Sequence, residues 1–179
     1  VEVPDGVEKV GDVTECDPLV EYDPNFMMDL KFFEEEVYWV QKIRSDAAAR
    51  HGNVTGFLSF MVCDASRCLP PEDIDFAIAL DDILPPLLTY CPESQHLCED
   101  HDAEDHEEPM EAESGILEPV VWDVNIYENG DAFELVFHAV VDSCWHTYSQ
   151  HLESFDGPMP TAFRIDWPCL LYTSPSPRD

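Results

Sequence analysis

The sequence predicts an all-β sandwich, and two observations lead to this prediction. Several short segments alternate apolar and polar residues with the period of two that a half-buried strand requires. Pro, Gly and Asp residues that favour turns separate these segments, and no apolar pattern of ordinary helix length occurs. Many short strands between frequent turns are typical of a β-sandwich.

The first structured region, residues 1–80, contains three predicted strands. The first covers residues 37–43, and its better-buried face is predicted to hold Val37, Trp39, Gln41 and Ile43. The second, residues 53–63 (NVTGFLSFMVC), is rich in aromatic and β-branched residues. The third, residues 73–80 (DIDFAIAL), places its apolar residues on one face. Residues 21–33 are expected to be irregular, because Asp-Pro signals a turn.

The second structured region, residues 118–167, follows an acidic segment. Residues 81–117 include CEDHDAEDHEEPMEAES, whose dense negative charge and few apolar side chains predict a disordered linker. Structure is expected to resume in PVVWDVNIYENGDAFELVFHAVV, where Asn129-Gly130 separates two alternating segments. An Asn-Gly pair in this position favours a type I′ hairpin turn. The string PTAFRID then begins another predicted strand.

The last residues do not continue the strand pattern. The string CLLYTSPSPRD back-translates without a mismatch into DNA that resembles a transposase adapter used in sequencing-library preparation. We therefore interpret residues 168–179 as read-through of synthetic DNA and leave them out of the fold prediction. Natural sequence is then expected to end near Trp167.

The charge of the chain limits the kinds of partner that it binds. Its formal net charge is −31, from 8 basic and 39 acidic residues. Such a charge argues against binding to nucleic acid or to an anionic membrane surface. No apolar stretch has the length of a membrane span, and VEVPDGVEKVGDV lacks the pattern of a signal peptide. We therefore expect no direct membrane insertion of this chain.

Two of the seven cysteines stand close together at the end of a predicted strand. Cys63 and Cys68 have four residues between them, and Pro70-Pro71 follows. The prolines stop the strand ladder and would hold the thiols at an exposed rim. A ring this short gains only about 2 kcal/mol from loop entropy, whereas a disulfide for stability usually closes a longer loop. Arg67 would favour a thiolate and Asp64 would oppose it. The spacing is equally compatible with a plain hairpin disulfide or with two free cysteines.

A metal site is not expected. The cysteine pair alone supplies only two of the four ligands that zinc usually takes. The acidic segment offers a richer set of donors, namely Cys91, His96, Cys98, His101 and His106. Their spacing matches no closed zinc module, so we interpret them as part of a solvated linker. A metal-buffering role of this segment is the weakest alternative. Cys144 is expected to be a small buried residue.

Three strings together resemble one protein family. VTGFLSFMVCDASRCLPPEDIDF resembles the end of the N-terminal periplasmic domain of DsbD, the thiol:disulfide interchange protein. GVEKVGDVTECDPLVEYDPNFMMDLKFFEEEVYWVQKI resembles the middle of that domain. WDVNIYENGDAFELVFHAVVDSCWHTYSQHLESFDGPMPTAF resembles its beginning, through Trp-His-x-Tyr-Ser-Gln and Gly-Pro-x-Pro-Thr. The better-known members have one more residue between their two cysteines.

The resemblance implies an immunoglobulin-like β-sandwich, but the order of its parts is changed. The back half of the family domain corresponds to residues 1–80, and the front half corresponds to residues 118–167. Two truncated tandem copies, a natural permutation and a faulty assembly would each give this order. In every case the halves are complementary, so we expect them to dock as one permuted sandwich. The Asn129-Gly130 hairpin should then contact the strands near residues 37–43 or 54–62.

The resemblance also assigns roles to individual residues. Cys68 would attack partner disulfides, and Cys63 would resolve the mixed disulfide. Phe26, with Met27 beside it, would shield the cysteines in a cap loop; the alternative is that Phe26 is a core residue. Tyr148 would line the site, although a packed strand aromatic is a simpler interpretation. The remaining candidates are His146, which would tune a thiolate, and Arg67.

The function that follows is that of a thiol–disulfide exchange module in the periplasm, with protein-disulfide reductase activity and no cofactor. Its implied partners are a membrane-embedded DsbD-type carrier domain that supplies electrons and thioredoxin-like periplasmic proteins that accept them. The main alternative is a non-catalytic immunoglobulin-like interaction domain in which the hairpin disulfide is structural.

Overall fold

The computed structural model describes residues 7–23, 26–45, 53–87, 91, 117–153 and 157–166, and within these ranges the fold is all-β, as predicted. The strands are β1 (Val7–Glu15), β2 (Leu19–Asp23), β3 (Met28–Phe33), β4 (Glu36–Ser45), β5 (Asn53–Phe60), β6 (Val62–Cys63), β7 (Glu72–Ala79), β8 (Ile83–Leu84), β9 (Val120–Asn129), β10 (Ala132–Val141), β11 (His146–Tyr148) and β12 (Ala162–Asp166). The described part of the chain contains no helix that is long and apolar enough to cross a membrane.

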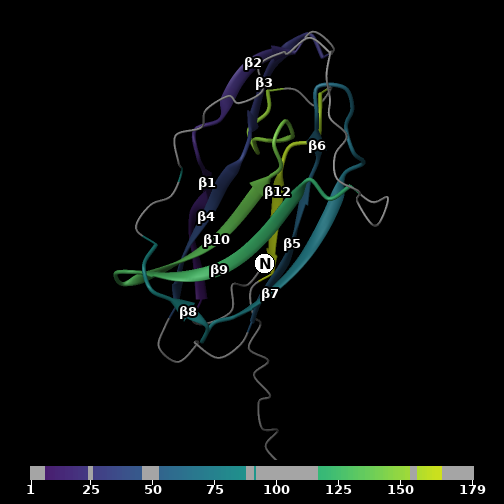
Figure 1. Ribbon diagram of the computed structural model, residues 1–179. Helices are drawn as coiled ribbons and strands as arrows, with labels where there is room; N and C mark the ends of the chain where they lie inside the picture. The colour runs from purple at the N-terminus through teal and green to yellow at the C-terminus, as the bar shows by residue number, and fades with distance from the viewer. Residues whose placement is uncertain are drawn as a thin grey trace, which may run out of the picture.

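The strands form three sheets in a sandwich-like arrangement (Figure 1). A five-stranded sheet has the order β1-β4-β10-β9-β8, and a three-stranded sheet has the order β12-β5-β7. The third sheet, of order β2-β3-β11-β6, lies toward the end of the molecule opposite β8 (Figure 1). The two regions of the chain are mixed in all three sheets, because β10, β11 and β12 each pair with a strand of the first region.

The main core lies between the five-stranded and the three-stranded sheet. Phe137 on β10 contacts Phe76 on β7, with ring centroids 5.2 Å apart, and Phe163 on β12, with centroids 4.5 Å apart. Trp39 on β4 lies 5.7 Å from the same Phe163 ring. Since these contacts join residues from both regions, the prediction that the two regions share one core is confirmed.

The predicted contact between the Asn129-Gly130 hairpin and the strand at residues 37–43 is also confirmed. β10 pairs antiparallel with β4, from Phe133 opposite Ile43 to Val140 opposite Glu36. The predicted inner face of β4 is buried, since each of its members has 0% of its surface exposed: Val37, Trp39, Gln41 and Ile43. A period-two pattern therefore identified both the strand and its orientation.

The turn of this hairpin differs from the prediction. Ala132 pairs with Asn129, so the two central residues are Gly130 and Asp131. A type I′ turn needs positive φ at both central residues, and only Gly130, with φ of 62°, has it. The predicted type I′ turn is therefore wrong, and the turn is displaced by one residue from Asn129-Gly130.

Three further segments differ from the sequence-based expectations. The segment expected to be irregular, residues 21–33, contains regular strand, because β2 and β3 pair antiparallel with Leu19 opposite Phe32. The first residues of the expected linker are not disordered, because β8 pairs parallel with β9 and Cys91 forms a disulfide. Residues 88–90 and 92–116 of the expected linker lie outside the described residues. β1 was not predicted; its ladder shifts register between Val10 and Thr14, and this irregularity hides the period of two. The predicted adapter read-through at residues 168–179 lies outside the described residues.

Candidate functional site

The hairpin between the two cysteines is held by the side chain of Asp64. Its Oδ1 accepts hydrogen bonds from the backbone N–H of Ser66 (2.7 Å) and of Arg67 (2.8 Å), and from the Ser66 hydroxyl (2.8 Å). The backbone N–H of Asp64 donates to the carbonyl of Arg67 at 2.9 Å. An aspartate that binds backbone groups two and three residues ahead fixes a turn. The sequence Asp-Ala-Ser-Arg thus brings Cys63 and Cys68 together.

Cys63 and Cys68 form a disulfide in this hairpin, with their Cα atoms 4.0 Å apart. The two cysteines differ in their surroundings, because the Cys63 residue on β6 is only 2% exposed whereas the Cys68 residue is exposed. An incoming thiol or disulfide therefore reaches Cys68 first.

The third sheet brings His146 and Tyr148 next to this pair. β11 lies between β3 and β6, with His146 opposite Cys63 and Tyr148 opposite Phe32. The His146 Nε2 atom is 3.0 Å from the Tyr148 hydroxyl oxygen, and the His146 ring lies 5.0 Å from the Phe32 ring. Tyr148 is 1% exposed. It is therefore both a packed strand aromatic and a neighbour of the cysteine pair.

Phe26 and Met27 precede β3 and have different surroundings. Phe26 is partly buried and packs against a small cluster formed by Leu30, Phe32, Cys63 and Tyr148. Its backbone N–H donates to the Asp23 carboxylate at 3.2 Å. Met27 is 77% exposed and has a φ of 54°. Phe26 thus packs against the cluster that contains Cys63, whereas Met27 is largely exposed, and the shielding role of the two residues stays a prediction.

Arg67 lies beside the pair but is held by two other groups. Its Nε donates to Asp64 Oδ2 at 3.2 Å, and its guanidinium lies 5.6 Å from the Trp145 ring centroid. The Asp64 carboxylate therefore offsets part of the cationic field that would favour a thiolate. Trp145 stands next to His146 in the sequence, so the hairpin also contacts the second region through this cation–π pair.

The pKa values of three groups near the pair are shifted. Burial lowers the pKa of His146 below its usual value, although the Glu34, Asp23, Asp64 and Glu21 carboxylates act in the opposite direction. Burial, assisted by the charge of Asp23, raises the pKa of Tyr148. Burial alone would raise the pKa of Asp64, but its hydrogen bonds from Ser66 and Arg67 prevail and lower it. At neutral pH the site therefore contains a neutral imidazole, a neutral phenol and an ionised Asp64.

A second disulfide, Cys16–Cys91, was missed by sequence reasoning. It spans 75 residues, and Cys16 at the end of β1 is 5% exposed. Through loop entropy, a disulfide that closes such a long ring stabilises the folded state by about 4 kcal/mol, roughly twice the value for the short Cys63–Cys68 ring. Cys144 also takes part in a disulfide and is exposed, so the expectation of a small buried residue is wrong. Spacing alone carried no signal for either bond, because such pairings are not deducible from sequence.

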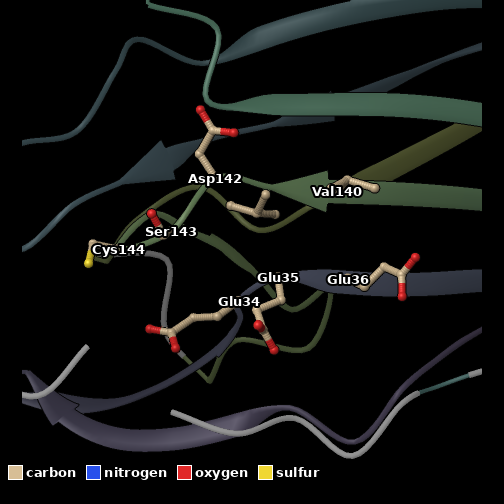
Figure 2. A pocket seen from close by; sticks show the side chains of 8 residues that line it. Glu34, Glu35, Glu36, Val140, Asp142, Ser143 and Cys144 are labelled. Carbon is tan, nitrogen blue, oxygen red and sulfur yellow. The ribbon is translucent and has the colours of Figure 1, made fainter. Parts of the chain in front are cut away.

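A pocket of about 370 Å³ is acidic, and no residue of the cysteine hairpin lines it (Figure 2). Glu34, Glu35 and Glu36 line one side, and the segment from Val140 to Cys144 lines the other. In Figure 2 the Asp142 side chain points away from those of Glu34 and Glu35. Within the described residues, no group of three or more His, Cys, Asp or Glu side chains is placed to hold a metal ion. Of the donor set noted in the acidic segment, Cys91 is bonded to Cys16, and the other four residues lie outside that part of the chain.

Comparisons with known proteins identify no relative of this chain. No family model, no curated protein and no solved structure matches the chain. A proposed function can therefore draw only on the geometry of the site and on the sequence resemblance.

We predict that Asp64→Ala makes the Cys63–Cys68 disulfide easier to reduce. Loss of the Asp64 hydrogen bonds loosens the turn, so the two thiols meet less often and their disulfide becomes less stable. One lost hydrogen-bonded turn is equivalent to about 1 kcal/mol, which raises the reduction potential by about 20 mV. Equilibration with thiol buffers of known potential measures this shift.

Asp64→Asn is the matched control, because an amide oxygen still accepts from the Ser66 and Arg67 backbone. We expect less than half of the shift for this variant. The same potential in the wild type and in Asp64→Ala would show that the turn does not preorganise the pair. Since the pKa of Asp64 is lowered, its ionised form stabilises the hairpin at neutral pH, and this stabilisation is lost as the pH falls through that lowered pKa.

We also predict that Phe26→Ala accelerates alkylation of Cys63 in the reduced protein severalfold. Removing the ring opens a path to a sulfur that is otherwise 2% exposed. Timed reaction with iodoacetamide, followed by peptide mapping, measures the rate at each cysteine. Met27→Ala is the control, because its side chain is already 77% exposed, and we expect no change for it. An unchanged rate combined with a large fall in melting temperature would identify Phe26 as a core residue only.

Proposed function

We propose that this chain is a thiol–disulfide exchange module of the DsbD N-terminal type, with Cys63 and Cys68 as its exchange pair. The observation that carries the proposal is the contrast between the two sulfurs in one short ring. Cys68 is exposed, whereas Cys63 is buried within a cluster against which Phe26 packs. Exchange needs one sulfur that partners reach and a second that resolves the mixed disulfide, and this arrangement offers both.

The proposed reaction transfers two electrons without a bound cofactor. In the reduced module the Cys68 thiolate attacks a partner disulfide, which forms a mixed disulfide and releases one partner thiolate. The Cys63 thiolate then attacks the Cys68 sulfur, forms the Cys63–Cys68 bond and releases the second partner thiolate. The partner is reduced to a dithiol and the module is oxidised. By resemblance, a membrane-embedded carrier domain would reduce the module again, and the partners would be thioredoxin-like proteins.

The proposed fold is an immunoglobulin-like sandwich in permuted order. Strand pairing across the two regions supports it, because β10 pairs with β4 and β11 lies between β3 and β6. Strands from the two half-domains therefore complete one another's sheets. The proposed location is the periplasm, and the disulfides of this chain support an oxidising compartment, since disulfides persist there and are rare in the cytosol.

One observation favours the alternative of a non-catalytic interaction domain. β2 is an edge strand of the third sheet, and it exposes 56% of Val20 and 62% of Tyr22. An exposed edge with apolar side chains is a common protein-binding feature. In that alternative the Cys63–Cys68 disulfide would be structural and would resist reduction.

Redox titration separates the two functions, because the chain carries an internal reference. We predict that thiol buffers reduce Cys63–Cys68 at about −180 to −270 mV, the range of exchange proteins. Cys16–Cys91, which closes the longer ring, should remain oxidised until below about −300 mV, the range of structural disulfides. Thiol trapping and mass spectrometry assign each state. Reduction of both disulfides only below about −300 mV would show that the hairpin disulfide is structural.

A further inference from the structure

The resolving step of the proposed exchange requires a proton acceptor for Cys63. A thiol must lose its proton before its sulfur attacks, and an ordinary cysteine has a pKa of about 8.5. Burial in apolar surroundings raises that value further. Cys63 is 2% exposed and packs with Leu30, Phe32 and Tyr148, so bulk water has little access to its proton. A group inside the protein is therefore the natural acceptor.

His146 is the titratable side chain that faces Cys63 directly across the ladder. The two residues are antiparallel partners on β11 and β6, so their side chains lie on the same face of the sheet. Directly opposed residues have Cβ atoms about 4.5–5.5 Å apart, within reach of an imidazole. The ring is fixed in place, because Nε2 lies 3.0 Å from the Tyr148 hydroxyl and the Phe32 ring lies 5.0 Å away.

The charged groups around His146 suit a transient imidazolium. Four carboxylates raise the pKa of the His146 ring. Glu21 and Asp23 belong to β2, Glu34 follows β3, and Asp64 belongs to the cysteine hairpin. Tyr148, the neighbour on its own strand, is a neutral phenol. Burial keeps the pKa of His146 below 6.5, so the imidazole is neutral and able to accept a proton near pH 7. The surrounding carboxylates stabilise the cation once it forms.

We propose that His146 accepts the proton of Cys63 in the resolving step and that Tyr148 positions the imidazole for this transfer. This inference rests on the proposed exchange function. In the step, Nε2–H donates to the Tyr148 hydroxyl oxygen, and Nδ1 takes the proton of the Cys63 thiol. The Cys63 thiolate attacks the Cys68 sulfur, the bond between Cys68 and the partner breaks, and the partner leaves as a thiolate. That thiolate or water then takes the proton from the imidazolium, so no net charge remains on His146.

The test separates attack by Cys68 from ring closure by Cys63. The full chain is reduced with dithiothreitol, mixed with the aromatic disulfide DTNB and quenched with acid at set times. Mass spectrometry of the peptide with both cysteines then distinguishes the reduced form, the mixed disulfide at Cys68 and the closed ring. Formation of the mixed disulfide depends on the DTNB concentration, whereas ring closure does not.

Two substitutions remove the proton acceptor. His146→Gln keeps a polar side chain, and His146→Phe keeps a ring that packs against Phe32 and so protects the fold. In both variants we expect ring closure at pH 7 to slow by about a hundredfold, the lower end of the effect of a positioned base. Formation of the mixed disulfide at Cys68 should stay within about twofold of the wild type. His138→Gln is the control, because His138 stacks on Tyr38 and pairs with Glu36 on other strands, and it should change neither step.

The pH profile of the wild type tests the same claim without any substitution. Because the pKa of His146 is lowered, the ring-closure rate should level off above that pKa and fall only below about pH 6.5. In the two variants the rate should keep rising with pH toward the pKa of the thiol. Wild-type closure rates and an unchanged pH profile in both variants would overturn the inference and leave His146 as a packing residue. If the wild type forms no mixed disulfide at Cys68, the proposed exchange function itself fails.

Discussion

The insertion of β11 between β3 and β6 is the constraint on which the candidate site depends. Thr147 pairs with Phe33 on one side and with Val62 on the other, and its hydroxyl donates to the Met61 carbonyl at 3.2 Å. Thr147 is 0% exposed, whereas its neighbours His146 and Tyr148 face the opposite side of the sheet, toward Cys63. The three residues of β11, which belong to the second region, thus complete the sheet that carries Cys63, which belongs to the first region.

The residues that follow β11 form hydrogen bonds to β1. The Glu15 carboxylate accepts hydrogen bonds from the Gln150 backbone N–H at 3.0 Å, from the Trp39 indole N–H at 3.0 Å and from the Ser149 hydroxyl. The next residue, Cys16, carries the long-range disulfide to Cys91. A partly buried polar network therefore joins the residues after β11 to β1, and the long disulfide ring begins at the next residue. The molecule thus combines a reinforced frame with one small hairpin closed by a short disulfide ring, and in the proposed function only this ring changes its covalent state.

Local patterns in the sequence predicted most of the long strands, but they missed β1 and the short β11. The alternation of Val37, Trp39, Gln41 and Ile43 correctly identified β4 and its buried face, and the same reasoning found β5, β7, β9, β10 and β12. β11 has only three residues and forms through pairing with β3 and β6, which are distant in the sequence. β1 was missed because a register shift interrupts its period, and the Gly130-Asp131 turn was placed one residue too early. Pairing with strands that are distant in the sequence determined the structure at each of these positions, and local propensity does not encode such pairing.

The sequence indicated which residues belong to the candidate site, but it did not indicate how they are arranged. The spacing of Cys63 and Cys68 before two prolines indicated the pair, and the family resemblance supplied Phe26, His146 and Tyr148 as neighbours. The register of His146 opposite Cys63, and the exposure of Cys68 beside a buried Cys63, required the three-dimensional structure. The Asp64 turn was visible in the sequence only as a charge opposing a thiolate. In the structure its hydrogen bonds to Ser66 and Arg67 build the hairpin.

Trapping a mixed disulfide with a thioredoxin-like protein tests the central claim most directly. The partner is a thioredoxin variant that keeps one active-site cysteine, activated as its mixed disulfide with thionitrobenzoate, so that it has no second thiol to break an adduct. In Cys63→Ser the Cys68 thiolate should attack this disulfide, release thionitrobenzoate as the better leaving group and form a stable, reducible adduct at Cys68. In Cys68→Ser the remaining Cys63 is buried and should form little adduct. Peptide mapping after non-reducing electrophoresis identifies the bonded cysteine. Equal adducts from both variants, or none from Cys63→Ser, would contradict the account of an exposed attacking sulfur and a shielded resolving one.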